Sequence, residues 1–325
     1  MKIISLEDHF ATAMLVEKSP RTTAGGKTHL ADINARLGHD LEMELSNLGD
    51  TRITAMDAAG IDVQVISFTQ PGSQGYAPET AIPLARDAND RLSEAVKAYP
   101  ERFAGFAALP TESPIESVKE LERAVRVLGF KGALINGPSQ GRFLDHRKYW
   151  DIFACAESLD VPIYLHPAMP RHEVMTSYFD GYPELASAPW GFTIETGAHF
   201  LRLVFAGVFD AYPKLKIILG HLGEALPFLM HRINTHSYQA AKRRGLKKTP
   251  IEYIQDHLIV TTSGNFFTPA FLCTYMALGA DQILFSVDWP YEKNTSATEF
   301  LKALPICEQD KEKIAHLNAE RLLHL

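Results

Sequence analysis

The sequence has few cysteines, and they are too far apart to form a cluster. Cys155, Cys273 and Cys307 form no CxxC pair, so neither a disulfide framework nor a cysteine-rich zinc finger is expected. We interpret them as reduced thiols, which predicts a cytoplasmic protein. The chain begins MKIISLEDHF and reaches acidic residues after a very short apolar run, which does not fit a secretory signal peptide.

Long apolar runs and blocks of basic residues are also missing. No stretch approaches 18 uninterrupted apolar residues, so no membrane span is predicted. The 39 acidic residues outnumber the 32 basic ones, which gives a net charge of −7. An acidic chain without a Lys/Arg block binds a phosphate backbone poorly, so nucleic acid is not an expected partner. A hydrophobic content of 46% is typical of a folded globular protein.

The sequence does contain a regular alternation of short apolar runs and amphipathic stretches. The runs are continuously hydrophobic, which is typical of strands buried on both faces of a parallel sheet. They cover 2–9, 63–69, 103–110, 132–136, 162–167, 216–221, 257–263 and 283–290. Helical patterns cover 81–98, 114–128, 149–159, 192–209, 224–232, 269–278 and 310–323.

The polar residues at the strand ends favour one arrangement of these elements. Alternating strands and helices fit either a closed (β/α)8 barrel or an open doubly wound sheet. Polar side chains lie at the carboxyl ends of six strands, namely Glu7, His9, Asn136, His166, His221, Ser263 and Asp288. In a closed barrel these ends converge on one mouth. We therefore predict an α/β fold, a (β/α)8 barrel, with one domain over residues 1–325.

Two segments interrupt the repeat and are predicted as extended loops at the carboxyl-terminal face. Residues 10–50 follow the first strand and include a short helical pattern near 40–48. Residues 168–190 follow the fifth strand and are rich in aromatic residues and proline. Loops at this face build the pockets of barrels. The aromatic loop suits a flat ligand, and it suits a contact with a second subunit equally well.

The first strand ends in a polar sequence that suits a metal site. Residues two apart in a regular strand point to the same side. If Leu6 and Asp8 face the helices, Glu7 and His9 both face the barrel axis. On its own this pattern also fits a strand that simply runs into a loop.

Two further strand ends complete a set of four candidate metal ligands. His166 ends the fifth strand and Asp288 ends the eighth, which neighbours the first strand in a closed barrel. Two carboxylates and two imidazoles suit one Zn²⁺ ion or a harder ion such as Mn²⁺. A metal would satisfy all four groups, which otherwise face one another unpaired. We therefore predict one divalent metal ion held by Glu7, His9, His166 and Asp288.

His221 and Glu224 form a second candidate pair. His221 ends the sixth strand, and Gly223 allows a tight turn into a helix that Glu224 is expected to open. The helix dipole alone would favour a carboxylate in that first turn. Glu224 can also hold one imidazole nitrogen of His221 so that the other nitrogen faces a ligand. We favour this second interpretation because His221 lies at the same mouth as the predicted metal ligands.

Seven segments, taken in order, resemble one family over nearly the whole chain. They are 6–10 (LEDHF), 106–110 (FAALP), 132–136 (GALIN), 164–167 (YLHP), 217–224 (IILGHLGE), 261–266 (TTSGNF) and 283–290 (ILFSVDWP). They resemble the amidohydrolase-superfamily decarboxylases that act non-oxidatively on hydroxybenzoates. This group contains the γ-resorcylate, 2,3-dihydroxybenzoate, salicylate and 5-carboxyvanillate decarboxylases.

The resemblance implies a fold, an activity and roles for particular residues. It implies a barrel with one Zn or Mn ion per subunit, a small aromatic carboxylate such as 2,6-dihydroxybenzoate as substrate, and a homodimer or homotetramer. It also implies metal ligation by Glu7, His9, His166 and Asp288, with catalytic roles for Asp288, His221 and Glu224. By resemblance, Arg232 reaches a substrate carboxylate or ring substituent, in its own subunit or in a neighbouring one, and a surface arginine without such a role is the equal alternative. Asn136 and Phe266 are weaker candidates for the substrate pocket.

Particular residues point to different members of this group and leave other functions open. The opening Glu-x-His favours decarboxylases over the superfamily's hydrolases, and His9 matches the γ-resorcylate enzymes. Residues 135–136, 140–145 and 195–199 are more similar to the 5-carboxyvanillate branch. The alternative function is a lactone or amide hydrolase that uses the same four ligands. A third possibility is a non-catalytic barrel that binds aromatic compounds.

Overall fold

The strands form a parallel barrel in a computed structural model that describes residues 1–18 and 34–325. The strands are β1 (Ile4–Phe10), β2 (Val63–Phe68), β3 (Phe103–Gly105), β4 (Ala107–Ala108), β5 (Ala133–Asn136), β6 (Ile163–His166), β7 (Ile217–Leu219), β8 (Leu258–Thr261) and β9 (Ile283–Leu284). Only Phe106 separates β3 from β4, and its backbone N–H donates to Ile66 O of β2 at 2.9 Å. β3 and β4 therefore make a single barrel strand, which gives eight strand positions.

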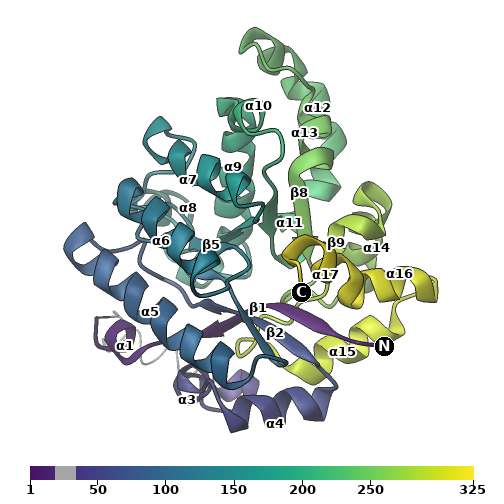
Figure 1. Ribbon diagram of the computed structural model, residues 1–325. Coiled ribbons are helices and arrows are strands. Elements are labelled where there is room, and N and C mark those ends of the chain that lie inside the picture. Colours follow the sequence, from purple (N-terminus) through teal and green to yellow (C-terminus); the bar gives the residue numbers. More distant parts are fainter. Residues whose placement is uncertain (19–33) are drawn as a thin grey trace.

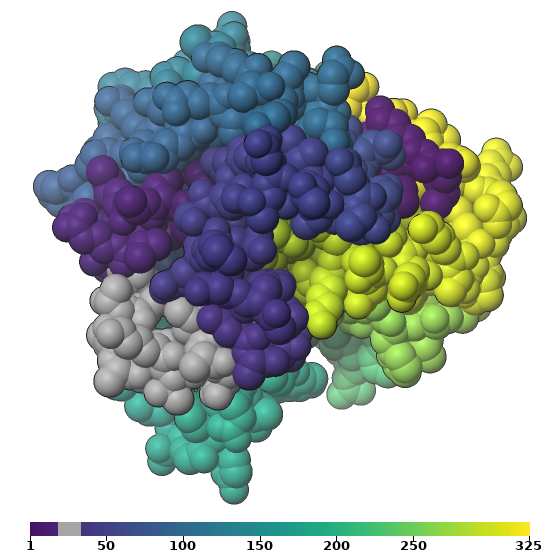
Figure 2. Space-filling view, turned by 90° about the horizontal axis from the view of Figure 1, so that it is seen from below, coloured from purple at the N-terminus to yellow at the C-terminus, as the bar shows by residue number. Residues whose placement is uncertain are grey.

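The first and last strand positions close the barrel. Hydrogen bonding runs in order from β1 to β3 and from β4 to β9, with every pair parallel. A parallel bridge joins Leu6 of β1 to Ser286 just after β9, and the Leu6 N–H donates to Phe285 O at 3.3 Å. Figure 2 shows the first and last parts of the chain packed side by side. The predicted closed barrel is confirmed.

Helices surround the strands on the outside (Figure 1). After β1 come α1 (Ala13–Lys18), α3 (Leu41–Ser46) and α4 (Asp50–Ala59), and after β2 and β4 come α5 (Pro78–Ala98) and α6 (Pro114–Arg126). After β5 and β6 come η2 (Arg147–Tyr149), α7 (Trp150–Ser158), α8 (His172–Tyr178), η3 (Pro183–Ala186), α9 (Gly191–Ala206) and α10 (Val208–Ala211). The remaining helices are α11 (His221–Glu224), α12 (Leu226–Arg243), α13 (Pro250–His257), α14 (Thr268–Leu278), η4 (Ala280–Gln282), α15 (Asn294–Ala303), α16 (Glu308–Glu312), η5 (Lys313–Leu317) and α17 (Asn318–Leu323).

Two apolar clusters fill the molecule. The larger one lies between the strands and the surrounding helices, and a smaller one fills the barrel itself. The inner cluster includes Leu6, Phe106 and Tyr164 from the strands, together with Ala319 and Leu323 of α17. Apolar side chains thus occupy the barrel interior, so the polar site lies at the carboxyl ends of the strands, as in other barrels.

The two predicted loop insertions contain short helices. Residues 19–33, which belong to the predicted insertion 10–50, lie outside the described residues. α3 matches the helical pattern expected near 40–48, and α8 and η3 occupy the aromatic segment 168–190. Among the described residues, no helix combines the length and the apolar character that a bilayer crossing requires.

Candidate metal and active site

Four side chains of metal-binding types meet at the mouth of the barrel. Glu7 and His9 belong to β1, His166 ends β6, and Asp288 follows β9. One ligand atom from each residue lies within 4.8 Å of the other three. His9 Nε2 is 3.2 Å from Asp288 Oδ1, and His166 Nε2 is 3.4 Å from Glu7 Oε1. The structure thus brings together all four residues that the sequence predicts as ligands.

β1 is irregular at the residue that carries the first carboxylate. Its register with β2 shifts between Ser5 and Asp8, and Glu7 has a φ of 55°. Leu6 lies in the inner core of the barrel, so the prediction that it faces the helices is wrong. The physical reason is the irregularity, which breaks the two-residue alternation and turns Leu6 and Glu7 inward together. Asp8 lies on the outer side, near Arg52 of α4, as predicted.

Buried atoms without partners show that this group fits a metal ion. Among the described residues, Glu7 Oε1, His9 Nε2 and Asp288 Oδ1 are buried and have no hydrogen-bond partner. Unpaired polar atoms in a protein interior cost free energy, and these three lie close together. A single divalent cation would satisfy them, and a set of two oxygens and two nitrogens suits Mn²⁺ or Zn²⁺.

Each histidine ligand has a partner for its second ring nitrogen. His166 Nδ1 lies 2.8 Å from Pro167 O, which places the proton on Nδ1 and leaves the lone pair on Nε2. His9 Nδ1 lies 3.4 Å from Ser67 Oγ. Burial and the neighbouring His9 hold the pKa of His166 well below its ordinary value. A neutral imidazole is the form that binds a metal.

Hydroxyl groups inside the barrel hold the other oxygen of Glu7. Tyr164 of β6 and Thr261 of β8 both donate to Glu7 Oε2, the latter at 3.3 Å. Burial raises the pKa of Glu7, although the charge of His221 opposes this shift. The sequence pattern alone does not single out Tyr164 or Thr261 as residues that support the site. A signal was present, because Tyr164 lies two residues before His166 and so on the same face of the strand.

A left-handed turn presents His221 and Glu224. Residues 221–225 have consecutive φ values of 53°, 61°, 83°, 52° and 61°, a conformation that costs free energy for residues other than glycine. The turn places His221 Nδ1 2.7 Å from Glu224 Oε1, as the sequence predicts. The helix that Glu224 was expected to open begins instead at Leu226, because Glu224 itself is left-handed.

Neighbouring elements hold this turn in place. The His221 N–H donates to Ser263 Oγ at 3.0 Å, and Thr274 Oγ1 of α14 donates to Leu222 O at 3.2 Å. Gly223 has no room for a side chain, since a Cβ there would lie 2.8 Å from Val260 Cγ1. These contacts stabilise a strained backbone at the point where the site needs two side chains together.

The charges around His221 favour its protonated form. Its Nε2 lies 3.7 Å from Glu7 Oε1 and also 3.7 Å from Asp288 Oδ2. Burial lowers the pKa of His221, but the Glu224 and Glu7 carboxylates outweigh it and raise the pKa well above its ordinary value. Burial raises the pKa of Asp288, yet the neighbouring His221 and His9 outweigh it and bring the pKa well below its usual range.

A buried arginine supports the site from the outer side of the barrel. The Arg52 guanidinium lies 4.2 Å from the centre of the Trp289 ring and donates to His9 O at 2.6 Å. The His9 N–H donates to Trp289 O at 2.6 Å, and Asp8 Oδ1 accepts from the Trp289 N–H at 3.2 Å. Burial lowers the pKa of Arg52 to about 9 and raises the pKa of Asp8 to about 8. Arg52 was not predicted as a residue of the site, because residues 50–59 were not predicted to form α4.

Two of the three predicted substrate contacts are partly or fully buried. Asn136 ends β5 in register with His166, and its Nδ2 donates to Phe68 O at 3.2 Å. Its Oδ1 is buried without a partner among the described residues. Phe266 is half-buried, with its ring centre 5.8 Å from that of Phe300 in α15.

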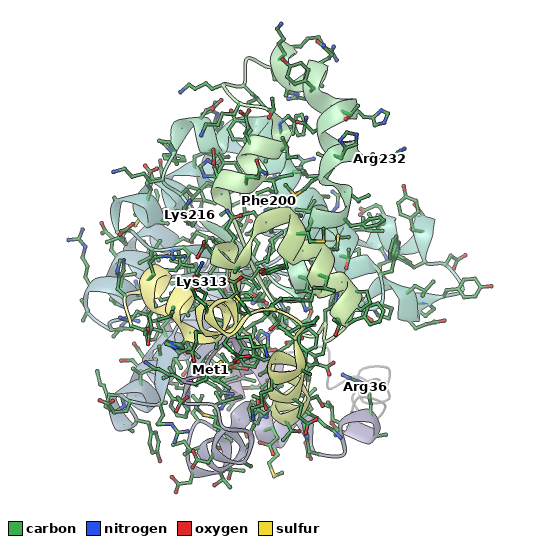
Figure 3. All side chains as sticks on the ribbon, turned by 90° about the vertical axis from the view of Figure 1, so that its right-hand side faces the viewer. Met1, Arg36, Phe200, Lys216, Arg232 and Lys313 are labelled. Atoms are coloured by element: carbon green, nitrogen blue, oxygen red, sulfur yellow. The ribbon has the colours of Figure 1, made fainter. Side chains whose placement is uncertain are left out.

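The third predicted contact, Arg232, lies away from this group. It is exposed on α12 and points outward from the molecule in Figure 3. No hydrogen bond or ion pair of Arg232 is found within residues 1–18 and 34–325. The structure does not bring it to the four ligands of its own chain, so a contact with substrate in a neighbouring subunit stays a prediction.

The chain is similar to known decarboxylases along its whole length. It is 39% identical to the γ-resorcylate decarboxylase of Rhizobium radiobacter over 99% of this chain and 98% of the relative. A structure of dihydroxybenzoic acid decarboxylase from Polaromonas sp. JS666, with manganese and the inhibitor 2-nitroresorcinol, superposes with a TM-score of 0.92 at 39% identity and covers 100% of this chain and 97% of that one. For 5-carboxyvanillate decarboxylase from Novosphingobium aromaticivorans, complexed with manganese, the TM-score is 0.92 at 34% identity, with coverage of 100% and 96%.

A family model agrees with these relatives. The model described as "Amidohydrolase" matches residues 28–325, which is most of the sequence. The match includes His166, His221 and Asp288. The chain belongs to the amidohydrolase family.

Proposed function

We propose that this protein catalyses the metal-dependent, non-oxidative decarboxylation of an ortho-hydroxybenzoate such as 2,6-dihydroxybenzoate, and the reverse carboxylation. The observation that carries the proposal is the convergence of Glu7, His9, His166 and Asp288 within 4.8 Å, beside the hydrogen-bonded His221–Glu224 pair. Decarboxylases that are similar over 99% of the chain support the same reaction.

The proposed cofactor is one divalent ion per subunit, Mn²⁺ or alternatively Zn²⁺. Glu7, His9, His166 and Asp288 would hold it, and the manganese in the structures of two relatives favours Mn²⁺. When bound, such an ion supplies a Lewis acid that lowers the pKa of a phenol and binds a carboxylate.

Asp288 and His221 are the proposed proton-transfer groups. Direct loss of CO₂ from an arene would leave an aryl anion, so a proton must first reach the ring carbon that bears the carboxylate. We assign this donation to Asp288, which first receives the proton from His221, whose Nε2 lies 3.7 Å from Asp288 Oδ2. Ionisation of the ortho hydroxyl returns a proton to His221. Cleavage of the bond to the carboxylate then releases CO₂, and its electron pair restores the aromatic ring. Glu224 keeps the His221 ring oriented, and His221 stabilises or relays charge at the ortho oxygen.

The proposed substrate contacts include a neighbouring subunit. Asn136 and Phe266 are assigned to the pocket, and Arg232 to the site of the adjacent subunit in a homodimer or homotetramer. Support for assembly comes from aromatic side chains exposed on the segment after β6, where Tyr178 is 77% exposed and Trp190 is 55% exposed. Large exposed apolar groups are common at subunit contacts. A cytoplasmic location is proposed as well, because all three cysteines are free.

A panel of substituted benzoates tests this function. An ortho hydroxyl feeds electrons to the carbon to be protonated and places a second oxygen beside the carboxylate. We therefore expect CO₂ release from 2,6-dihydroxybenzoate, 2-hydroxybenzoate or 5-carboxyvanillate, which all carry that group. We expect none from 4-hydroxybenzoate or 2-methoxybenzoate. The gap should exceed the ~10²-fold that loss of one hydrogen bond explains.

Two results would count against the proposal. Similar kcat/KM values for the 2-hydroxy and 2-methoxy compounds would remove the role of an ionisable ortho oxygen. Turnover of a lactone or amide panel without CO₂ release from any benzoate would favour the hydrolase alternative.

A further inference from the structure

The two carboxylate oxygens of Glu7 have different surroundings. Oε2 accepts hydrogen bonds from the hydroxyls of Tyr164 and Thr261, from within the barrel. Oε1 is buried and has no hydrogen-bond partner among the described residues. It lies 3.4 Å from His166 Nε2, on the side of the other ligands. One oxygen of this carboxylate is therefore committed to the protein, and the other is left for an ion.

Tyr164 is well placed to impose this asymmetry. It is fully buried in the inner core and lies two residues before the ligand His166 on β6. A tyrosine hydroxyl ordinarily has a pKa of about 10, so it is protonated at neutral pH and can donate to the carboxylate. A buried hydroxyl that donates to a carboxylate makes a strong, directional bond. A single strand thus supplies one ligand and the group that orients another.

A chain of neighbouring hydroxyl groups connects Glu7 to the left-handed turn at residues 221–225. Thr261 Oγ1 lies 2.8 Å from Tyr164 Oη and 2.9 Å from Ser263 Oγ, which in turn accepts from the His221 N–H. The packing around Glu7 is equally close. A Cβ on Gly220 would lie 2.6 Å from Glu7 Oε2 and 2.8 Å from Ser263 Oγ. The Glu7 carboxylate therefore has little room to rotate.

We propose that Tyr164 is a positioning residue that keeps Glu7 a one-oxygen metal ligand by holding Oε2 and leaving Oε1 to the ion. The inference rests on the metal site of the proposed function. Without the Tyr164 hydroxyl, Oε2 loses one of its two hydroxyl donors among the described residues, so it is held less firmly and can also be offered to the ion. Partners of ligating side chains typically contribute 10- to 100-fold to metal affinity.

The test compares Tyr164→Phe with Tyr275→Phe in the full-length protein. Tyr275 of α14 donates to Asp310 Oδ2 at 2.6 Å, so the control removes the same kind of bond at a distance from the ligands. Stripped proteins are titrated with Mn²⁺, and free Mn²⁺ is followed by electron paramagnetic resonance. The visible spectrum of the Co²⁺-loaded proteins reports ligand geometry. We expect Tyr164→Phe to weaken Mn²⁺ binding at least 10-fold and to alter the Co²⁺ spectrum, and Tyr275→Phe to change neither by more than about twofold.

Equal affinity and an unchanged spectrum in Tyr164→Phe would overturn the proposal. If Tyr164→Phe does not fold, Thr261→Val is used for the same test, because it removes the second donor to Glu7 Oε2. Unchanged Mn²⁺ binding in Thr261→Val would then overturn the proposal. Decarboxylation of 2,6-dihydroxybenzoate by the wild-type protein is measured on the same samples. Wild-type protein that binds Mn²⁺ without turnover contradicts the proposed function and leaves the Tyr164 result intact.

Discussion

At the scale of single residues, His221 is assigned a role in catalysis but not in metal binding. Its Nδ1 is engaged by Glu224, and its Nε2 faces both Glu7 and Asp288 at 3.7 Å. That position is beside the predicted ligand set rather than within it. A residue there can stabilise or move charge on a substrate without holding the ion.

His221→Ala should therefore lower kcat by about 10²-fold or more while metal content stays near one ion per subunit. Glu224→Gln should have a smaller effect in the same direction, since an amide still accepts a hydrogen bond from Nδ1 but lacks the charge. Steady-state kinetics with metal analysis on the same preparations measures both quantities. Loss of the metal in His221→Ala would show that the ligand assignment is wrong.

The residues that carry the site were easier to predict than those that support them. Glu7, His166 and Asp288 are charged or metal-binding types at the ends of apolar runs, where burial without a function is costly. Tyr164 and Arg52 act through hydrogen bonds to residues that are distant in the sequence. A tyrosine within an apolar strand and an arginine on a helix are both common, so neither attracts notice in the sequence. Only the three-dimensional arrangement reveals what they hold.

At the scale of elements, regular periodicity was predictable and its interruptions were not. The strands and the long amphipathic helices follow from continuous or periodic apolar patterns. The irregularity in β1 at Glu7 and the left-handed turn at 221–225 depend on contacts with neighbouring strands and with α14. Tertiary contacts overrode the local rule at both places, and both places belong to the site.

α9 carries a buried histidine, His199, whose contribution to the stability of the fold depends on pH. His199 Nε2 accepts from the Leu144 N–H at 3.1 Å and lies against Phe143, which fixes the loop before η2 onto the helix. Burial lowers the pKa of His199 from 6.5 to about 3. Between these values the unfolded chain binds a proton that the folded protein does not. The stability from this group is therefore complete above pH 6.5 and is lost as the pH falls.

His199→Gln should remove this dependence, because glutamine can accept the same hydrogen bond without titrating. Well below pH 6.5 each pH unit is worth about 1.4 kcal/mol, but at pH 6.5 the unfolded histidine is only half protonated. The wild-type free energy of unfolding should therefore fall by about 2.3 kcal/mol more than that of His199→Gln between pH 6.5 and 4.5. Urea unfolding at the two pH values measures the difference. Parallel losses in the two proteins would mean that His199 is protonated in the folded state.

At the scale of the whole molecule, the site joins distant parts of the chain. β1 and the segment after β9 are the two edges that close the barrel, and they supply three of the four predicted ligands. His166 of β6 supplies the fourth from the middle of the sequence. An ion bound here would link the closing edges to the strands between them, so its effect should extend to global stability.

Removing the metal should therefore lower the melting temperature, and adding Mn²⁺ should restore it. A ligand that binds only the folded state stabilises it by about 2.7 kcal/mol at 100 times its dissociation constant. For a chain of 325 residues, this corresponds to a rise in Tm of about 4 °C. Differential scanning calorimetry of the chelator-treated protein, with and without Mn²⁺, measures the rise. His221→Ala should keep the rise because this residue lies outside the ligand set, whereas His9→Ala should lose most of it because His9 Nε2 is one of the buried atoms that a cation would satisfy. An equal rise in His9→Ala would place the ion elsewhere in the protein.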